Sequence, residues 1–304
     1  WFKSYLSDRT QTFSTAGKQS TPLNVECSVP QGSVLGPLEF ISYTENIREI
    51  FDSFKITHHL FADDKQLLKS SEIKDINSVQ LLLSSCISVV RDWCSSRRLQ
   101  LNASKTELIW FGSHCNLNKL SNTDLTVTVG SDVIQPVSVV RDLGVYLDSE
   151  MTMKEHVRRI TRNCFFQIRR LRQVRRSAGP EVMKRLVSAL ILSRLDYCNA
   201  ALAGLPQSTI QPLQRAQNSA ARLISNCSRF EHITPVLKGL HWLPVNLRIQ
   251  YKLCLLMHLI HTHQCPQYLR EIVTLTSSSA TRPGLQSASG LSYHKPWIRT
   301  KFGE

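Results

Sequence analysis

Residues 54–68 read FKITHHLFADDKQLL, with two short strand-like runs, 54–62 and 65–68, on either side of the acidic pair Asp63-Asp64. Two such runs around a tight polar turn predict a β-hairpin that carries both carboxylates at its tip. Adjacent carboxylates repel each other unless a cation neutralises them, and Mg²⁺ prefers carboxylate oxygens. The stretch therefore indicates either a metal site suited to phosphoryl transfer or a solvated Asp-Asp turn. Taken alone, it does not separate the two.

The sequence on both sides of this hairpin predicts a mixed α+β region. Gly32 permits an unusual turn, and the apolar spacing after it predicts a helix over residues 34–50. A second, amphipathic helix is predicted over residues 73–93. Stretches rich in β-branched and aromatic residues then predict a small sheet, with strands at 107–111, 125–129 and 137–147.

Beyond Asp148 the pattern changes to helices alone. An apolar stripe at spacings of three and four predicts a helix that ends at Gly179-Pro180. Three more helices are predicted at 181–203, 208–225 and 244–262. The α+β half therefore ends near residue 150, and the Ser/Thr-rich tail after Pro266 is expected to be loosely ordered.

The chain is strongly basic. Its 304 residues include 37 Lys and Arg against 23 Asp and Glu, a formal charge of +14. Such an excess attracts polyanions such as nucleic acids, and an otherwise ordinary basic protein has the same balance. The nine cysteines are never spaced C-x-x-C, which predicts reduced thiols in a nuclear or cytoplasmic protein. The longest apolar runs are too short to predict a membrane span or a membrane partner.

Six short strings carry a family resemblance. They are PQGSVLGP at 30–37, FADD at 61–64, NASKTE at 102–107, RDLGV at 141–145, LDYCN at 195–199 and HWLPV at 241–245. Together they resemble the reverse transcriptases of non-LTR, LINE-type retrotransposons of the Jockey-like branch. The first four are similar to motifs B, C, D and the primer-grip motif E, and the last two to the thumb and C-terminal region. The resemblance covers roughly residues 1 to 270.

The resemblance implies an α+β fold with part of a right-hand polymerase. A partial palm, an antiparallel sheet with helices, would span 1–150, a helical thumb 151–225, a C-terminal helical region 226–270 and a loose tail 271–304. The implied activity of the intact parent is RNA-directed DNA synthesis, a nucleotidyltransferase reaction with Mg²⁺ or Mn²⁺ as cofactor. Its implied partners are an RNA template, a DNA primer and dNTP.

The resemblance also implies roles for single residues. Asp63 and Asp64 would be the catalytic, metal-binding carboxylates of motif C. The nucleotide and template pocket would include four residues, Gln31, Gly32, Phe61 and Ala62. Lys105 matches the motif D lysine that assists the leaving group, and it is equally a solvated lysine before a strand.

An arginine-rich helix is the second candidate site. The arginines expected to contact a nucleic-acid backbone are Arg158, Arg159, Arg162, Arg169, Arg172 and Arg176. In a thumb they would follow the phosphates of a primer–template duplex without reading its sequence. The alternative is an Arg-rich face that only meets water.

One element of the family has no counterpart here. Motif A supplies a third essential carboxylate, but the acidic residues before Gln31 are Asp8 and Glu26, neither in a motif A context. We therefore expect a truncated chain, without motif A, the fingers or an endonuclease domain. Because two metals need three carboxylates, two interpretations stay open: a polymerase fragment, or a catalytically dead nucleic-acid-binding remnant. Glu39, on a helix expected to face the core, is a further departure that should destabilise the fold.

Overall fold

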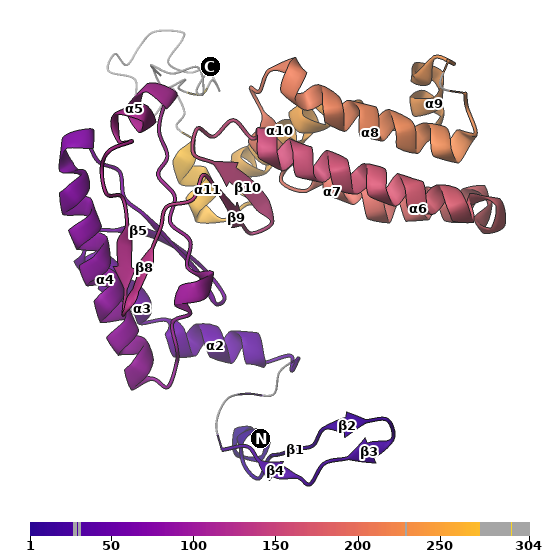
Figure 1. Ribbon diagram of the computed structural model, residues 1–304. Coiled ribbons are helices and arrows are strands. Elements are labelled where there is room, and N and C mark those ends of the chain that lie inside the picture. The colour runs from indigo at the N-terminus through magenta and orange to yellow at the C-terminus, as the bar shows by residue number, and fades with distance from the viewer. Residues whose placement is uncertain (27–28, 30–31, 229, 274–292, 294–304) are drawn as a thin grey trace. The chain divides into compact units, whose positions relative to one another are not determined.

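The computed structural model describes residues 1–26, 29, 32–228, 230–273 and 293. The chain forms two compact units (Figure 1). Unit 1 comprises Trp1–Leu108 and Asn118–Pro136, and unit 2 comprises Ile109–Leu117 and the chain from Val137 onward. Helices and small antiparallel sheets occur in the described residues, so the fold is α+β, as the sequence predicted.

Unit 1 starts with a narrow ribbon that the hydrophobic pattern does not predict. Its elements are α1 (Phe2–Leu6), β1 (Thr10–Gln11), β2 (Ser14–Thr15), β3 (Lys18–Gln19) and β4 (Leu23–Asn24). β1 pairs with β4 and β2 with β3, and all the strand side chains are exposed. With neither face buried, the sequence has no alternation of apolar and polar residues to reveal these strands.

The single helix predicted over 34–50 is wrong in its extent. Two helices occupy this region, α2 (Gly36–Thr44) and α3 (Ile47–Ser53). The break follows Thr44, whose hydroxyl donates to the carbonyl of Phe40 at 2.8 Å within the last turn of α2. Hydrogen bonds of this kind bend or weaken a helix. The break lets α3 turn Ile47 and Phe51 into the core of unit 1, where each is 1% exposed.

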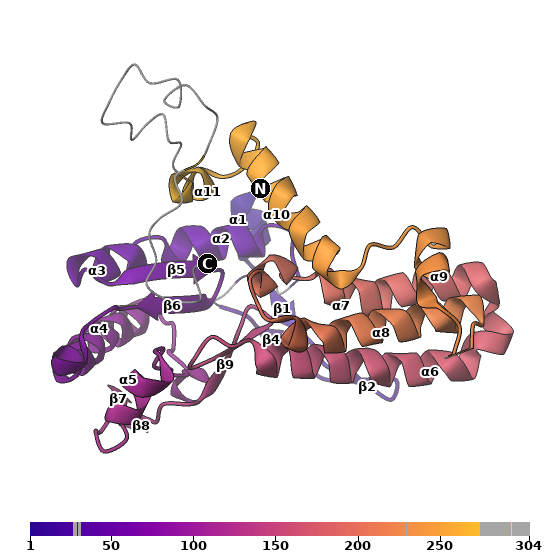
Figure 2. The same cartoon turned by 90° about the horizontal axis from the view of Figure 1, so that it is seen from above.

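α4 (Ile76–Ser96) confirms the predicted amphipathic helix, and a 3-10 turn at Ile73–Asp75 precedes it. Its buried side chains pack with α3, and figure 2 shows α3 and α4 beside the hairpin of β5 and β6. Among the described residues, Ile73–Ser96 is the one helical stretch long and apolar enough, by length and composition, to cross a membrane. The sequence prediction considered only unbroken apolar runs, whereas this stretch meets the criterion through its mean hydropathy. A core helix meets the same criteria, so no membrane partner follows from it.

The strands after α4 are shorter and more divided than predicted. Residues 107–111 form no strand, and only an isolated bridge joins Leu108 to Pro136. The predicted run at 137–147 is a hairpin, β9 (Val139–Asp142) and β10 (Val145–Asp148), and β7 (Val127–Val129) pairs with β8 (Asp132–Ile134). In the described parts of the chain every sheet has two strands, so the single small sheet predicted here is wrong. The short helices between are Ala103–Lys105 and α5 (His114–Lys119).

Unit 2 is mainly helical, as predicted. Its helices are α6 (Lys154–Val187), a π-helical turn (Ser188–Leu192), α7 (Ser193–Asp196), a 3-10 turn (Asn199–Leu202), α8 (Gln207–Ser225), α9 (Ile233–Gly239), α10 (Val245–His261) and α11 (Gln267–Ile272). Gly179 has φ 65° and ψ 164°, so α6 is two helices that meet at Gly179-Pro180, the predicted end. α11 corrects the expectation of a loose tail for residues 267–272. Most of the rest of the tail lies outside the described residues.

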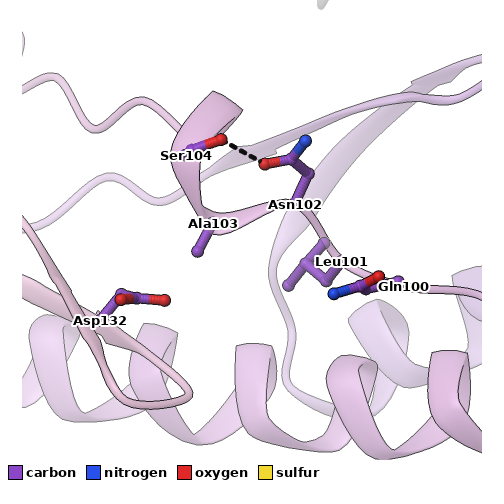
Figure 3. Close-up of a pocket in the computed structure, with 6 residues that line it drawn as sticks. All are labelled: Gln100, Leu101, Asn102, Ala103, Ser104 and Asp132. Atoms are coloured by element: carbon purple, nitrogen blue, oxygen red, sulfur yellow. Dashed lines mark hydrogen bonds between the residues drawn. The ribbon is translucent and has the colours of Figure 1, made fainter.

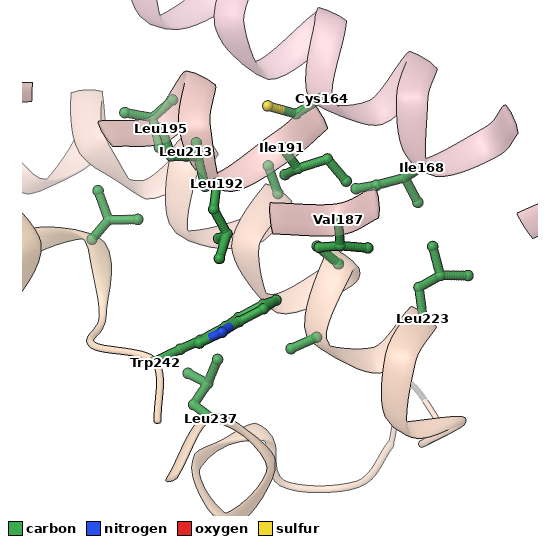
Figure 4. Close-up of a cluster of buried hydrophobic side chains, with 14 of the residues drawn as sticks. Cys164, Ile168, Val187, Ile191, Leu192, Leu195, Leu213, Leu223, Leu237 and Trp242 are labelled. Atoms are coloured by element: carbon green, nitrogen blue, oxygen red, sulfur yellow. The ribbon is translucent and has the colours of Figure 1, made fainter. Parts of the chain in front are cut away.

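The core of unit 2 forms where α6 lies against α8, an arrangement visible in figure 2. Ile168 of α6 lies near Val187 and Ile191 in this core, and Leu213 of α8 belongs to the same cluster (Figure 4). Ala216 and Ala220 of α8 are fully buried, and their small side chains let the two helices approach closely. Trp242 is 8% exposed in the same cluster. Burying this much apolar surface is the main stabilising contribution to the bundle.

The carboxylate of Glu39 is buried and, within the described part of the chain, unpaired, as the sequence predicted. Both of its carboxylate oxygens are buried, and they have no hydrogen-bond partner among the described residues. A carboxylate that loses water without gaining a partner destabilises the folded state.

Replacing this carboxylate should therefore stabilise the chain. We expect Glu39→Leu to raise the free energy of unfolding by roughly 1–3 kcal/mol, because the unpaired buried group is removed. Urea denaturation of the whole chain followed by circular dichroism measures the change. The control is Glu49→Leu on α3, where the carboxylate is exposed and the effect should be small. A loss of stability in Glu39→Leu would contradict the assignment.

His156 makes the stability of unit 2 depend on pH. The residue is 1% exposed, its Nδ1 accepts a hydrogen bond from the N–H of Tyr146 at 3.3 Å, and burial lowers the pKa of the imidazole below 6.5. As pH falls below 6.5, the unfolded chain therefore binds a proton that the folded chain does not. The stabilisation of the fold by neutral His156 is therefore fully present above pH 6.5. It is lost as the pH falls toward the lowered pKa of His156 in the folded chain.

We expect the urea midpoint to fall between about pH 7.5 and about pH 5.5, and to fall less in His156→Gln. Gln keeps an acceptor for the N–H of Tyr146 and does not titrate. His232→Gln is the control, because His232 is exposed. If the His156 and His232 variants showed the same pH dependence as the wild type, the buried imidazole would not be the cause.

Candidate active site and nucleic-acid interface

The predicted acidic hairpin is present. β5 (Thr57–Phe61) pairs antiparallel with β6 (Asp64–Leu68), and Phe61 pairs with Asp64 across the turn. Ala62 takes a left-handed φ of 52°, which closes the turn between them. Asp63 lies in the turn and Asp64 starts β6, and both are exposed. Because paired residues share a face of the hairpin, Asp64 and Phe61, itself 64% exposed, lie on the same side of the tip.

The base of this hairpin is fixed in the core of unit 1. Ile56, just before β5, is 3% exposed and packs in the same cluster as Phe51. The ring of His58 lies 5.2 Å from that of Phe51, between ring centres. At the other end, Lys65 Nζ donates to the backbone carbonyl of Asp63 at 3.2 Å. The hairpin thus has a packed base and an exposed acidic tip.

The turn before α2 shows why a glycine stands at position 32. Gly32 has φ 84°, a left-handed conformation that other residues adopt only with strain. A Cβ built on Gly32 would meet no atom within 4 Å, so the requirement is conformational and the space beside it is open. Ser33 Oγ accepts from the N–H of Gly36 at 3.1 Å and from the hydroxyl of Tyr5 at 2.5 Å. Gln31 lies outside the described residues.

Lys105 lies beside a shallow polar hollow of about 380 Å³ in unit 1. The hollow, drawn in figure 3, is lined by Gln100, Leu101, Asn102, Ala103, Ser104 and Asp132. Ser104 Oγ donates to Asn102 Oδ1 at 2.6 Å and so holds the turn that ends at Lys105. Lys105 is exposed and is not among the lining residues, and neither Asp63 nor Asp64 lines the hollow.

The acidic tip suits a divalent cation only in part. Its carboxylate oxygens are the ligands that Mg²⁺ and Mn²⁺ prefer. However, no group of three or more His, Cys, Asp or Glu that could hold a metal occurs in the part of the chain that the structure describes. Two exposed carboxylates can hold an ion that keeps most of its water, but they do not complete a two-metal site.

The arginine-rich helix belongs to unit 2. Because residues three, four or seven apart share a helix face, five arginines form one stripe on the first part of α6. They are Arg158, Arg162, Arg169, Arg172 and Arg176, and all are exposed. Four of them, all except Arg158, form no ion pair within the described residues. Their charges are therefore available to an anionic ligand.

Arg158 and Arg159 differ from the other arginines because Glu155 binds both. Glu155 accepts from Arg158 at 2.7 Å and from Arg159 at 2.6 Å, and these hydrogen bonds lower the pKa of its carboxyl to about 2. The pairs are solvent-exposed, so they orient the guanidinium groups more than they stabilise the fold. Glu155 was not predicted as a site residue, although its spacing of three and four residues from the two arginines is the signal for such pairs.

The β9–β10 hairpin lies beside this basic helix. Its turn is formed by Leu143 and Gly144, both with positive φ. On β10, the ring of Tyr146 has the guanidinium of Arg159 4.2 Å from its centre and that of Arg141 at 5.9 Å. The hairpin and the start of α6 therefore present basic and aromatic groups together. Tyr146 was not predicted as a site residue.

Residues 1–147 match the family model for reverse transcriptase (RNA-dependent DNA polymerase). A probable RNA-directed DNA polymerase from transposon BS of Drosophila melanogaster is 28% identical over 247 residues, 79% of this chain and 27% of that protein. The RNA-directed DNA polymerase from mobile element jockey of the same organism is 25% identical over 52% of this chain and 17% of that protein.

A third Drosophila melanogaster protein, a probable RNA-directed DNA polymerase from transposon X-element, is 25% identical over 78% of this chain and 26% of that protein. No solved structure matches the chain. The chain thus spans about a quarter of the length of the BS and X-element relatives.

Proposed function

We propose that this chain is a reverse transcriptase segment of a LINE-type retrotransposon, which supplies part of the active site and the duplex-binding surface of an RNA-directed DNA polymerase. One observation carries the proposal: the string FADD forms the exposed tip of a hairpin whose base is buried. A polymerase must bring acidic groups to the end of a primer, and a rigid hairpin with a bare acidic tip suits that task.

The described elements support a division into polymerase regions. We assign residues 1–150 to a partial palm with motifs B, C, D and E, 151–225 to a helical thumb and 226–270 to a C-terminal helical region. The palm assignment rests on the match over residues 1–147 and on the acidic hairpin. The thumb assignment rests on the helical bundle of α6 and α8 and on its stripe of exposed arginines.

Single residues receive roles on the same basis. Asp63 and Asp64 would be the catalytic carboxylates, and Phe61 and Ala62 would shape the turn that carries them. The open space beside Gly32 suits the close approach of a nucleotide or template base, and Gln31 would contact the same ligand. Lys105, exposed at the end of its turn, would reach the leaving group. Mg²⁺ or Mn²⁺ would be the cofactor, and dNTP the second substrate.

The described acidic groups near Asp63 and Asp64 are too few for catalysis by this chain alone. Two-metal phosphoryl transfer needs a third carboxylate, and none groups with Asp63 and Asp64 in the described residues. We therefore propose that, alone, the chain binds an RNA template paired to a DNA primer, in the nucleus or cytoplasm, and does not extend it. The second candidate function, a catalytically dead nucleic-acid-binding remnant, is favoured by the same observation.

We expect the purified chain to bind a primer–template and to incorporate no nucleotide when dNTP and Mg²⁺ are added. Supplying a polymerase segment with the third carboxylate in frame, in a protein that also carries Glu39→Leu, should restore extension. Extension by the restored protein that is lost in Asp63→Asn would support the polymerase role. If a well-folded restored protein stayed inactive, the remnant would be the better description, and efficient extension by the chain alone would refute the need for a third carboxylate.

Binding should depend on the arginine stripe. Replacing Arg162, Arg169, Arg172 and Arg176 with Gln should make the slope of log affinity against log salt shallower by roughly three to four on an RNA–DNA duplex, at about 0.9 per lost phosphate contact. The loss should be similar for all duplex sequences. Arg158 and Arg159 are left in place because Glu155 already binds them.

Two control variants test whether the change in slope comes from the stripe itself or from the loss of charge in general. A charge-matched variant replaces four exposed arginines elsewhere with Gln, at Arg48, Arg194, Arg215 and Arg270, and should change the slope much less. Asp63→Asn should leave the slope nearly intact, because its carboxylate repels phosphate and releases no counterion. Equal slopes in the stripe variant and the charge-matched variant would mean that the arginines of α6 only meet water.

A further inference from the structure

Two strings that carry no role in the proposed chemistry, LDYCN at 195–199 and HWLPV at 241–245, meet in unit 2. Leu195 and Trp242 lie in the same apolar cluster and are 2% and 8% exposed (Figure 4). The polar residues of the first string point to other partners. One of these partners is the turn of the β9–β10 hairpin.

Tyr197 holds this turn directly. Its hydroxyl donates to the carbonyl of Leu143 at 2.5 Å. Its ring lies against Gly144, where an added Cβ would come within 3.3 Å of the Cε1 atom of Tyr197. The contact therefore uses the hydroxyl at position 197, and the φ of 91° together with the close ring favours glycine at position 144.

The turn needs such support. Leu143 and Gly144 are the two central residues of a two-residue hairpin turn, with φ 42° and 91°. Turns with two positive φ angles favour Asn-Gly, whereas Leu adopts a left-handed conformation only with backbone strain. A hydrogen bond to the carbonyl of Leu143 offsets part of this cost and keeps the strained turn formed.

The end of α7 that carries Tyr197 is itself anchored. Asp196 accepts a hydrogen bond from Arg248 of α10 at 2.7 Å, and the Arg248 side chain is only 15% exposed. Arg248 Nε also donates to the carbonyl of Leu243 at 2.9 Å. The same carbonyl accepts from the side chain of Gln217, a fully buried residue of α8. Tyr197 therefore projects from a junction fixed by α8 and α10.

We propose that Tyr197 is a positioning residue, which latches the β9–β10 hairpin so that Arg141, Tyr146 and Arg159 face the primer strand in a fixed arrangement. The functional half of this inference rests on the proposed function. The latch itself is a property of unit 2 and can be tested without nucleic acid.

The test is Tyr197→Phe, which removes the hydroxyl and keeps the ring. Amide hydrogen exchange in the hairpin, at residues 143–145, should speed up roughly 2- to 10-fold, the range expected for one lost hydrogen bond. Affinity for an RNA–DNA primer–template should fall as well, by at most that factor, because affinity follows the fraction of chain with the hairpin formed. The salt slope should stay unchanged because no phosphate contact is lost. Tyr251→Phe is the matched control, since Tyr251 is 60% exposed on α10.

A rescue separates positioning from general stability. Leu143→Asn creates the Asn-Gly pair that this turn type favours, so it should restore slow exchange and affinity in the Tyr197→Phe background. Because Leu143→Asn also relieves backbone strain in the folded state, the comparison includes Asn226→Gly, at a left-handed position outside the hairpin, which should not restore slow exchange at residues 143–145. Urea denaturation of each variant shows whether the fold is intact.

Three results would overturn the proposal: unchanged exchange in Tyr197→Phe, faster exchange with unchanged affinity, or no rescue by Leu143→Asn. If the wild-type chain bound no nucleic acid, the proposed function would fail instead. The exchange measurement would then still decide whether Tyr197 latches the hairpin.

Discussion

The two-residue turn of the β5–β6 hairpin forces Asp63 and Asp64 into adjacent, exposed positions, where their charges repel each other. Water can solvate that charge only because the turn protrudes, and it protrudes because Ile56 and Phe51 hold the base of the hairpin in an apolar core. The site depends on this combination. A packed base without an exposed tip would require the carboxylates to be neutralised, and an exposed tip without a packed base would not be held in place.

Unit 2 likewise carries exposed charged side chains on elements with a buried apolar core, and here the charges are positive. Buried apolar side chains join α6 to α8, and the arginines of α6 remain exposed. Glu155 and Tyr146 orient the cations nearest the β9–β10 hairpin, while the other arginines of the stripe stay without an acidic partner in the described residues. The acidic tip thus belongs to unit 1 and the arginine stripe to unit 2, and each is carried by elements with a packed apolar core.

Some of these features could be predicted from the sequence and others could not. The acidic hairpin and the helices of unit 2 could be predicted because apolar spacing and turn residues act locally. The strands at 10–24 could not, because they have no buried face. The break after Thr44 depends on a hydroxyl bond within the helix, and the contact of Tyr197 with Leu143 joins residues far apart in the chain. Pattern alone identified the string LDYCN but not its partner.

If Asp63 and Asp64 act as proposed, the tip of the β5–β6 hairpin lies at the end of a bound primer. The most direct measurement replaces Phe61, which is exposed beside Asp64, with the photo-crosslinking residue p-benzoylphenylalanine, and maps the nucleotides that it reaches on a bound RNA–DNA duplex with a recessed primer. We expect the crosslinks to be concentrated at the 3′ end of the primer. Crosslinks spread evenly along the duplex, in a variant that binds as well as the wild type, would contradict it.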